Sequence, residues 1–408
     1  MKSLDHLYTQ LTRPTSAKLV LLVLDGLGDL AGKEEGYLTP LEAASTPHLD
    51  DLTQDSALGR MNPVAPGITP GNGPGQLGLF GYDPVEYQIG RGVIEALGLG
   101  LELKPGDLAA RANFCTLDAD GIVSDRRAGR IDSNHCERLC ALLSEQIKRI
   151  DDIDVIFRSG RGHRFVVVFR GPGLNGPLTD SDPHCDGRSV GRVEPVQADC
   201  EGAKKAVAIL AKFNERALSI LASDSKANGV LMRGIAARPN LPTFEERYRL
   251  RASALAVHPL YQGLGQLVGM RTEHGLEGIE SQFRRYLDTY EKYDYFFIHY
   301  RYTGIFGAEG QFEAKKKAIE DLDAALPVLL SKRPDVLAIT GDHSSPCIVQ
   351  GHSWHPQPVL LNSPFSGSDK LDRFTETTAN LGSLGVFDAK YLIRLMQANA
   401  RMLGKFGA

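Results

Sequence analysis

The sequence predicts an α/β protein, and three apolar segments carry that prediction. Lys18–Leu24 is rich in leucine and valine on both faces, which is typical of a central parallel strand, and it leads into Asp25. Tyr295–His299 and Asp335–Thr340 have the same character, and each also runs into a polar loop. The segment between these two has apolar residues at helical spacing, so strand, helix and strand follow one another as in an α/β sheet. Functional sites in such sheets form at the carboxyl ends of the strands.

A second domain is expected in the middle of the chain. With 408 residues, the protein exceeds the size at which a single hydrophobic core usually suffices. Residues 105–228 mix short strand-like runs, such as Phe165–Phe169, with polar loops, and turn-forming residues mark both ends. We therefore predict a core domain of residues 1–104 and 229–408, with an inserted domain of residues 105–228.

The composition excludes several classes of protein. Hydrophobic residues make up 42% and charged residues 24%, which is typical of a folded chain and not of a disordered or fibrous one. The net charge of −4 offers no general attraction for nucleic acid or for an anionic membrane. No apolar run approaches the length of a membrane span, and the N-terminal segment lacks the apolar core of a signal peptide. Six cysteines are too sparse for a disulfide scaffold, so we expect a cytoplasmic protein with free thiols.

Carboxylates and histidines follow two of the predicted strands. Asp342 and His343 come directly after one strand, His352 lies a little further on, and Asp25 follows the first strand. Carboxylate and imidazole together suit a divalent zinc, manganese or magnesium ion, although histidines also line ordinary polar loops. The segment 25–31 fits the glycine pattern of dinucleotide-binding loops as well. We disfavour that interpretation because no amphipathic helix follows to hold a pyrophosphate.

A basic cluster lies in the predicted inserted domain. Asp125–Arg130 contains three arginines, and Arg158, Arg161, His163 and Arg164 follow in the same domain. Such a cluster is either a solvated turn or a clamp for a phosphate, which arginine binds through two parallel hydrogen bonds. No aromatic residues are interleaved with these charges, which favours a small phosphorylated ligand over nucleic acid.

A series of short motifs occurs in a fixed order over nearly the whole chain. They are Leu24–Asp29, Thr39–Ala43, Thr46–Pro47, Phe80–Pro84, Gly90–Gly92, Glu95–Gly98, Lys104–Asp107, Asp125–Arg130, Ser181–His184, Leu231–Gly234, Thr340–His343 and Gly351–Ser353. Together they resemble one known family, the archaeal-type, cofactor-independent phosphoglycerate mutases of the alkaline phosphatase superfamily. The resemblance implies an alkaline-phosphatase-like three-layer α/β sandwich with an inserted α+β domain that binds substrate.

The resemblance also implies a mechanism and a set of site residues. In the family, a serine activated by two divalent metals takes the phosphoryl group of phosphoglycerate and returns it to the neighbouring hydroxyl, which interconverts 2- and 3-phosphoglycerate. By motif, Asp25, Asp342 and His343 would bind one metal, and His352 would bind the other. The residues that would bind the substrate are Arg126, Arg127, Arg130, His163, Arg164, Arg233 and Arg251.

The chain departs from the family pattern at the positions where the chemistry takes place. Asn72 occupies the place of the nucleophilic serine, and a carboxamide cannot carry a phosphoryl group. Gln76 replaces a histidine, while Gly304 and Ala308 replace residues that bind metal. The second metal would keep only one protein ligand, although divalent ions normally need three or four. Between the lost ligands, the apolar residues 305 and 306 are expected to fill part of the site.

Three functions are compatible with these observations. The first is a mutase-like protein that has lost mutase activity and keeps a phosphate-ligand-binding, partner or regulatory role. The second is a repurposed phosphotransfer or hydrolytic enzyme that uses a single metal, and the third is an active mutase with another nucleophile. For the first, we expect a divalent metal (Mn, Zn or Mg) that is weakly bound or absent. The expected partners are a small phosphorylated or carboxylated anion and a protein partner or a second copy of the chain, with no nucleic acid and no membrane.

Overall fold

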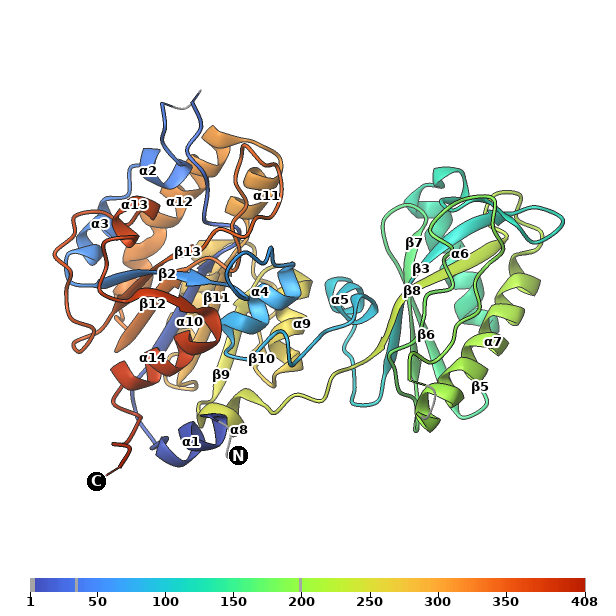
Figure 1. Cartoon of the computed structure of the whole chain (residues 1–408), viewed down its shortest axis with the longest axis horizontal. Helices are drawn as coiled ribbons and strands as arrows, with labels where there is room; N and C mark the ends of the chain where they lie inside the picture. Colours follow the sequence, from blue (N-terminus) through green and yellow to red (C-terminus); the bar gives the residue numbers. More distant parts are fainter. Residues whose placement is uncertain (1–3, 34–35, 198–199, 408) are drawn as a thin grey trace. The chain divides into compact units, whose positions relative to one another are not determined.

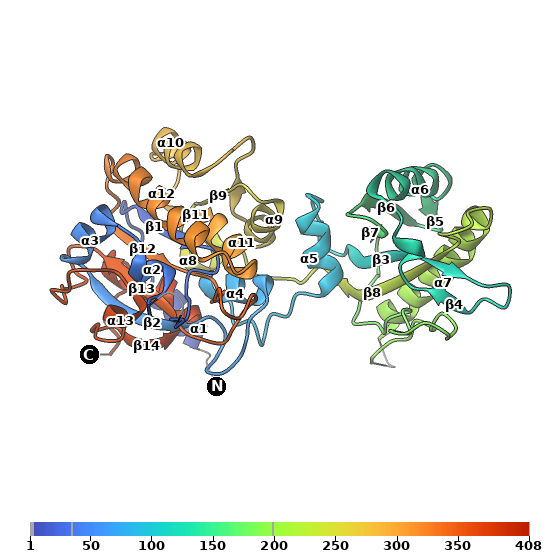
Figure 2. The ribbon, with the colours of Figure 1, turned by 90° about the horizontal axis from the view of Figure 1, so that it is seen from above.

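The computed structural model describes residues 4–33, 36–197 and 200–407. These residues form two compact units, one of the described residues within 1–88 and 241–408 and the other of those within 89–240. The elements of both units can be followed in Figures 1 and 2. No helix in the described ranges combines the length and the apolar character that crossing a bilayer requires.

The first unit is built around a mixed β-sheet, eight-stranded within the described residues. The three predicted strands are confirmed as neighbours near its centre, with the first between the other two, and all three are fully buried. Five adjacent strands are parallel, which brings their carboxyl ends to one edge. In spatial order, the strands are β10 (Arg271–Thr272), β9 (Ala252–Ala256), β11 (Tyr295–Tyr300), β1 (Leu19–Leu24), β12 (Val336–Thr340), β13 (Gln357–Asn362), β2 (Ala57–Asn62) and β14 (Gly385–Asp388).

Helices cover both faces of this sheet, which confirms the three-layer α/β class. On one face, alternate residues of β1 such as Leu22 pack into a core with Ile319 and Phe283 from the covering helices. On the other face, Phe297 of β11 packs against Phe80 at an edge-to-face angle. The first face carries α2 (Pro40–Ala43), α3 (Pro47–Thr53), α10 (Ile279–Thr289) and α12 (Phe312–Leu330), and the second carries α4 (Asn72–Leu79), α8 (Phe244–Tyr248), α9 (Pro259–Leu267) and α14 (Leu392–Asn399). The remaining helices of the unit are α1 (Leu4–Leu11), α11 (Tyr302–Ala308), α13 (Glu376–Ala379) and the single turn η2 (Ala389–Tyr391).

The second unit is an antiparallel sheet with helices, as expected for an α+β domain. Its core includes Phe114, Phe165 and Phe169 from the sheet, together with Phe213 from a helix. Two helices, α6 (Ser133–Gln146) and α7 (Glu201–Leu221), contribute to this core. The other elements are α5 (Arg91–Gly98), β3 (Leu108–Leu117), β4 (Val123–Asp125), the turn η1 (Ala128–Arg130), β5 (Arg149–Ile150), β6 (Ile153–Ser159), β7 (Arg164–Arg170) and β8 (Gly229–Ala237).

The units divide the chain at places that differ from the expected boundaries of 105 and 228. Strand β8 pairs along β3, from Leu108 opposite Ala237 to Cys115 opposite Gly229, so it belongs to the second unit. Helix α5 packs against both strands, and a Cβ at Gly92 would lie 2.3 Å from the backbone oxygen of Ala109. The inserted unit therefore extends outward on both sides, to residues 89 and 240.

Candidate functional site

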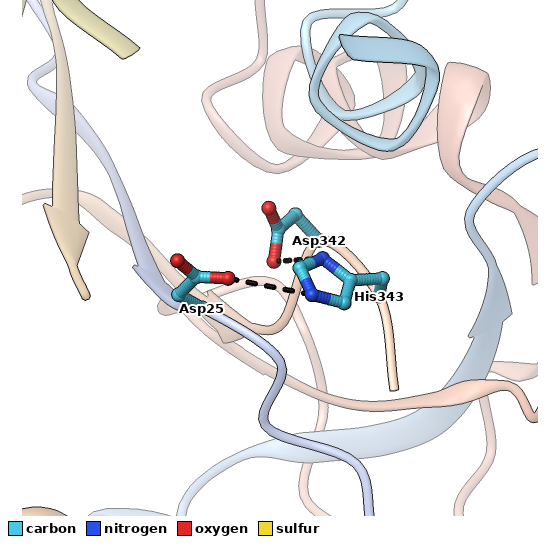
Figure 3. A group of neighbouring side chains, drawn as sticks. All are labelled: Asp25, Asp342 and His343. Atoms are coloured by element: carbon cyan, nitrogen blue, oxygen red, sulfur yellow. Dashed lines mark ion pairs between the residues drawn. The ribbon is translucent and has the colours of Figure 1, made fainter. Parts of the chain in front are cut away.

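The carboxyl ends of β1 and β12 bring together a compact group of potential metal ligands. Asp25 follows β1, whereas Asp342 and His343 follow β12, and one ligand atom from each lies within 4.8 Å of the others. Nε2 of His343 lies 3.4 Å from Oδ1 of Asp25, and its Nδ1 lies 3.0 Å from Oδ1 of Asp342 (Figure 3). All three side chains are buried. The structure thus brings together the three residues that the resemblance assigns to one metal.

A glycine turn after β1 makes this convergence possible. Gly26 adopts the left-handed conformation, with φ of 58°, and its N–H donates to Oδ1 of Asp342 at 3.1 Å. A Cβ at Gly26 would lie 2.7 Å from Oγ of Ser345 and 2.9 Å from Cα of Gly304. Only glycine therefore lets these three backbone segments approach one another.

Burial and mutual charge shift the pKa values of the group. Burial, and then the negative charge of Asp342, raise the pKa of Asp25 to about 7. Burial alone would raise the pKa of Asp342, but the neighbouring His343 outweighs it and lowers that pKa to about 2. The pKa of His343 is raised, because its two carboxylate neighbours outweigh the opposing effect of burial. A divalent cation would satisfy the charge of both carboxylates, so this donor set fits one metal ion.

Asn72 lies beside the group, linked to it through a tyrosine that sequence reasoning missed. Nδ2 of Asn72 donates to the Tyr261 hydroxyl at 3.1 Å, and that hydroxyl donates to Oδ2 of Asp25 at 3.1 Å. The Tyr261 ring stacks on buried His299, with ring centroids 3.5 Å apart. Burial lowers the pKa of His299 to about 3, so this imidazole is neutral near pH 7. The side chain of Gln76 is also fully buried, and neither of its polar atoms has a hydrogen-bond partner among the described residues.

The residues present do not fit a second metal ion. A Cβ at Gly304 would lie 2.6 Å from Oδ1 of Asp25, so a side chain at this position would point at that carboxylate, but glycine supplies none. Ala308 is exposed and has no donor atom. His352 stacks on His343 with centroids 3.8 Å apart, and its Nδ1 donates to the carbonyl of Pro70. A single imidazole with one free nitrogen does not make a divalent-metal site.

The expectation that Ile305 and Phe306 fill part of the site is wrong for Phe306 and finds no support for Ile305. Phe306 packs against the core on the α12 face of the sheet and stacks on Tyr302. Both side chains are only half-buried, whereas the buried residues of α11 are Thr303, Gly304 and Gly307. The helix therefore presents small residues to the buried side.

Lys315 supports the loops that carry the potential metal ligands, and sequence reasoning missed it. It is fully buried on α12, and its Nζ donates to the carbonyl of Gly26, to Oδ2 of Asp29 and to the carbonyl of Ser345. The three bonds measure 2.8, 2.8 and 3.0 Å and join the loop after β1 to the loop after β12. Its position in the helix could have indicated that it is buried, because Lys315 lies four residues before Ile319 on the apolar stripe of the helix.

A pocket of about 690 Å³ in the second unit gathers most of the predicted basic cluster, although Arg158 is not among the residues that line it. It also recruits Arg111 and Asn113 of β3, which sequence reasoning missed, and Arg161, which it had noted only as part of the cluster. The pocket is lined by Arg111, Asn113, Arg126, Arg127, Arg130, Ile131, Arg161, Gly162, His163, Arg164 and Arg233.

Arg251 is the exception among the predicted substrate-binding residues. It lies in the first unit, just before β9, at the amino end of the parallel strands. Its guanidinium forms an ion pair with Asp294, with Nη2 2.8 Å from Oδ1. Because this residue is exposed, already paired and at the edge opposite the potential metal ligands, nothing in the first unit supports its assignment to the substrate site.

The turn that carries three of the pocket arginines is held in an unusual conformation. Ala128, Gly129 and Arg130 have consecutive φ values of 52°, 62° and 54°, in the left-handed region that non-glycine residues rarely adopt. The carboxylate of Asp125 accepts the N–H groups of Arg127 and Gly129 at 2.7 and 2.8 Å. These bonds offset the backbone strain and fix where the arginine side chains begin.

A buried carboxylate orders one end of the pocket. Arg126 donates two parallel hydrogen bonds of 2.8 Å to Asp182, whose side chain is fully buried. Nε of Arg233 lies 3.7 Å from the same carboxylate. Burial would raise the pKa of Asp182, but the bonds from Arg126 and from the His184 N–H outweigh it and lower the pKa. This aspartate is therefore charged and positions two of the arginines.

Comparison with known proteins gives a consistent set of relatives. The sequence model of 2,3-bisphosphoglycerate-independent phosphoglycerate mutases matches residues 53–227. A probable 2,3-bisphosphoglycerate-independent phosphoglycerate mutase of Aquifex aeolicus is 46% identical over 98% of this chain and 99% of that protein. One of Thermosipho melanesiensis is 44% identical over 99% of both chains. Among solved structures, a cofactor-independent phosphoglycerate mutase from Thermoplasma acidophilum has a TM-score of 0.78 at 28% identity, covering 94% of this chain and 100% of that one. A protein from Pyrococcus horikoshii has a TM-score of 0.77 at 28% identity, covering 97% and 100%.

Proposed function

Because the chain belongs to the 2,3-bisphosphoglycerate-independent phosphoglycerate mutase family, we propose that it is a member that has lost the mutase reaction and kept the binding of a phosphorylated or carboxylated anion. Its role is that of a cytoplasmic regulatory or partner protein, which binds either another protein or a second copy of itself. The family reaction is the activity from which this chain diverged, and the chemistry of particular residues in this chain explains its loss.

Asn72 is the observation that carries this proposal. The family reaction, as the resemblance implies it, needs a hydroxyl that forms a covalent phosphoryl intermediate at this position. The carboxamide of Asn72 has no such group, and its nitrogen is already engaged as a donor to Tyr261. Thr69 of the same loop carries a hydroxyl, but it is exposed to solvent.

The loss of the second set of metal ligands supports the same conclusion independently. Asp25, Asp342 and His343 would hold one ion, which when bound would supply a Lewis acid that polarises an oxygen of the ligand. Gly304 and Ala308 offer nothing to a second ion. Nucleophile and metal ligands belong to separate segments of the chain, so their joint loss reflects the loss of one shared reaction.

The arginine pocket supports the retained part of the function. Its guanidinium groups come from β3, β7, β8 and two loops, and they converge on one space without an acidic residue among the described residues that line it. Arginine binds phosphate and carboxylate through paired, charge-assisted hydrogen bonds. A solvated turn would not need a buried aspartate and a strained backbone to fix its arginines.

Anion binding can be measured by isothermal titration of the full chain with 3-phosphoglycerate and with inorganic phosphate. Arg130→Gln should weaken binding of 3-phosphoglycerate about tenfold, because one charge-assisted interaction of this kind contributes about 1.5–3 kcal/mol. Arg138→Gln is the matched control, since this exposed arginine of α6 removes the same charge outside the pocket. Absence of uptake of either anion, or equal loss in both variants, would contradict the proposal.

A second function is favoured by one observation, the intact group of Asp25, Asp342 and His343. A repurposed phosphotransfer or hydrolytic enzyme could use one metal held by these residues, with water in place of the serine. Metal analysis after purification in manganese or zinc separates the two functions. One tightly bound ion per chain that Asp342→Asn removes, together with metal-dependent hydrolysis of a phosphate monoester, would favour the enzyme.

A further inference from the structure

We propose that Asn72 and Tyr261 position Asp25 for a divalent ion, so that the residue in place of the family nucleophile supports the potential metal ligands. The two residues act through a pair of hydrogen bonds, from Asn72 to Tyr261 and from Tyr261 to Asp25, which we call the relay. This inference concerns the metal group of the first unit and does not depend on anion binding by the arginine pocket.

The relay reaches one oxygen of the Asp25 carboxylate and leaves the other directed toward a second ligand. The Tyr261 hydroxyl donates to Oδ2 of Asp25 at 3.1 Å. The other oxygen, Oδ1, faces Nε2 of His343 at 3.4 Å (Figure 3). Side chains that bind a metal are usually held by an outer hydrogen bond, which fixes the orientation of the ligand. The two oxygens of Asp25 are divided in this way, one for the relay and one for an ion.

Two neighbouring rings fix the Tyr261 ring. The side chain is buried, and its ring stacks on His299 with centroids 3.5 Å apart. His258 contacts the same ring at an edge-to-face angle, with centroids 5.9 Å apart. His258 also begins α9, because its Nδ1 accepts the N–H of Leu260 and Pro259 occupies the first helical position. The Tyr261 hydroxyl therefore lies at a defined point beside Asp25.

Asn72 has the length and the position that the relay needs. It is the first residue of α4. A Cβ at Gly75 of this helix would lie 2.5 Å from the backbone oxygen of Asp342, so the helix is in direct contact with the loop that carries two of the ligands. A serine hydroxyl at position 72 would stand one bond closer to the backbone than Nδ2 of Asn72 does. With the same backbone it would lie further from Tyr261, so this hydrogen bond is a feature of the asparagine.

The first bond of the relay strengthens the second. A hydroxyl that accepts a hydrogen bond becomes a better donor, and in a buried site both bonds are stronger than in water. A tyrosine keeps its proton near neutral pH, so toward the carboxylate of Asp25 it can only donate. Removing the Asn72 side chain should therefore weaken the bond to Asp25, whereas removing the Tyr261 hydroxyl abolishes it.

Titration of the metal-free full chain with Mn²⁺ alone tests the inference, with free Mn²⁺ followed by electron paramagnetic resonance. Tyr261→Phe should weaken Mn²⁺ binding about tenfold or more, because loss of the outer partner of a metal ligand typically costs about 10–100-fold in affinity. Asn72→Ala should weaken binding by a smaller factor. Tyr286→Phe is the matched control and should leave the affinity unchanged. This tyrosine of the same unit is also buried, but its hydroxyl donates to the carbonyl of Lys332, just before β12 and at the opposite end of that strand from Asp342.

A double variant separates a relay from two independent effects. If Asn72 acts through Tyr261, Asn72→Ala should cause no further loss of Mn²⁺ affinity in the Tyr261→Phe protein. Thermal unfolding of each metal-free variant shows whether stability changes as well. A purely structural role of Tyr261 would lower Tm and leave the affinity for Mn²⁺ unchanged.

Three results would overturn the inference. They are an unchanged or tighter affinity in the Tyr261→Phe protein, full additivity of the two substitutions, and absence of Mn²⁺ binding by the wild type at millimolar concentrations. Each of them leaves the proposed function standing, because that function is tested by titration with anions and by an assay of turnover.

Discussion

Replacing Lys315 by methionine should destabilise the first unit strongly. The substitution removes a fully buried cation that joins the carbonyls of Gly26 and Ser345 to the carboxylate of Asp29. Asp29 would keep its bonds from the Leu30 and Cys347 N–H groups but lose its only ion-pair partner among the described residues. Removing one partner of a buried ion pair typically costs about 3–5 kcal/mol, because the other charge is left uncompensated.

Differential scanning calorimetry measures the effect. At roughly 2–4 °C per kcal/mol for a unit of this size, Tm should fall by roughly 6–20 °C. Lys317→Met is the matched control, since this lysine of the same helix is two-thirds exposed and forms only a surface ion pair with Asp321. If Tm of the Lys315→Met protein stays within about 2 °C of the control, the buried lysine does not support these loops and the account of the site is wrong.

Three further predictions concern the site itself. Asn72→Ser alone should restore no phosphoglycerate turnover, because Gly304 and Ala308 still lack metal ligands; measurable turnover in that single variant would contradict the assignment. Treatment with EDTA should hardly change Tm, because Lys315 already joins the two loops and the raised pKa of Asp25 lessens its negative charge near neutrality. A large fall in Tm that manganese reverses would favour the single-metal enzyme. The pKa of Asp25 is raised to about 7 in the native protein, whereas the unfolded chain releases this proton near the ordinary pKa of 3.8. Between pH 4 and about 7 the native state therefore binds more protons than the unfolded state, and the free energy of unfolding falls as pH rises. The Asp25→Asn protein should therefore gain stability relative to the wild type on going from pH 5 to pH 8 in metal-free denaturant unfolding, and a constant difference would refute the shifted pKa.

Much of the fold could be predicted because its central strands are locally distinctive. Lys18–Leu24, Tyr295–His299 and Asp335–Thr340 are apolar on both faces, and each is a central strand of the first unit. The domain boundaries could not be placed in the same way. Gly229–Ala237 is also an apolar run, and nothing in its own sequence tells which sheet it joins; its partner β3 lies far away in the chain.

The site was predictable where polar residues follow strands and unpredictable where the decisive contact is long-range. Asp25 and Asp342 meet because parallel strands place their carboxyl ends at one edge. Tyr261 and Lys315 come from helices, and only the packing of those helices brings their polar atoms to the ligand loops. The ion pair of Arg251 could not be predicted for the same reason, since its partner Asp294 lies far along the chain from it.

The sequence could not predict which side chains of α11 point toward the site. Phe306 packs toward the core on the α12 face, so the direction of a side chain on a short helix decided whether it entered the site. Composition of the segment alone could not give that direction, because seven residues span about two turns and leave the helical phase open.

The central claim is that this chain does not interconvert 2- and 3-phosphoglycerate, and a coupled assay tests it most directly. The purified full chain, supplied with manganese and 3-phosphoglycerate, is followed by the enolase-coupled formation of product beside the Thermoplasma acidophilum enzyme as a positive control. We predict no turnover above that of a blank without protein, because Asn72 cannot form the phosphoryl intermediate. Turnover that scales with the concentration of this protein and is abolished by Asp342→Asn would contradict the claim and identify the chain as a working mutase.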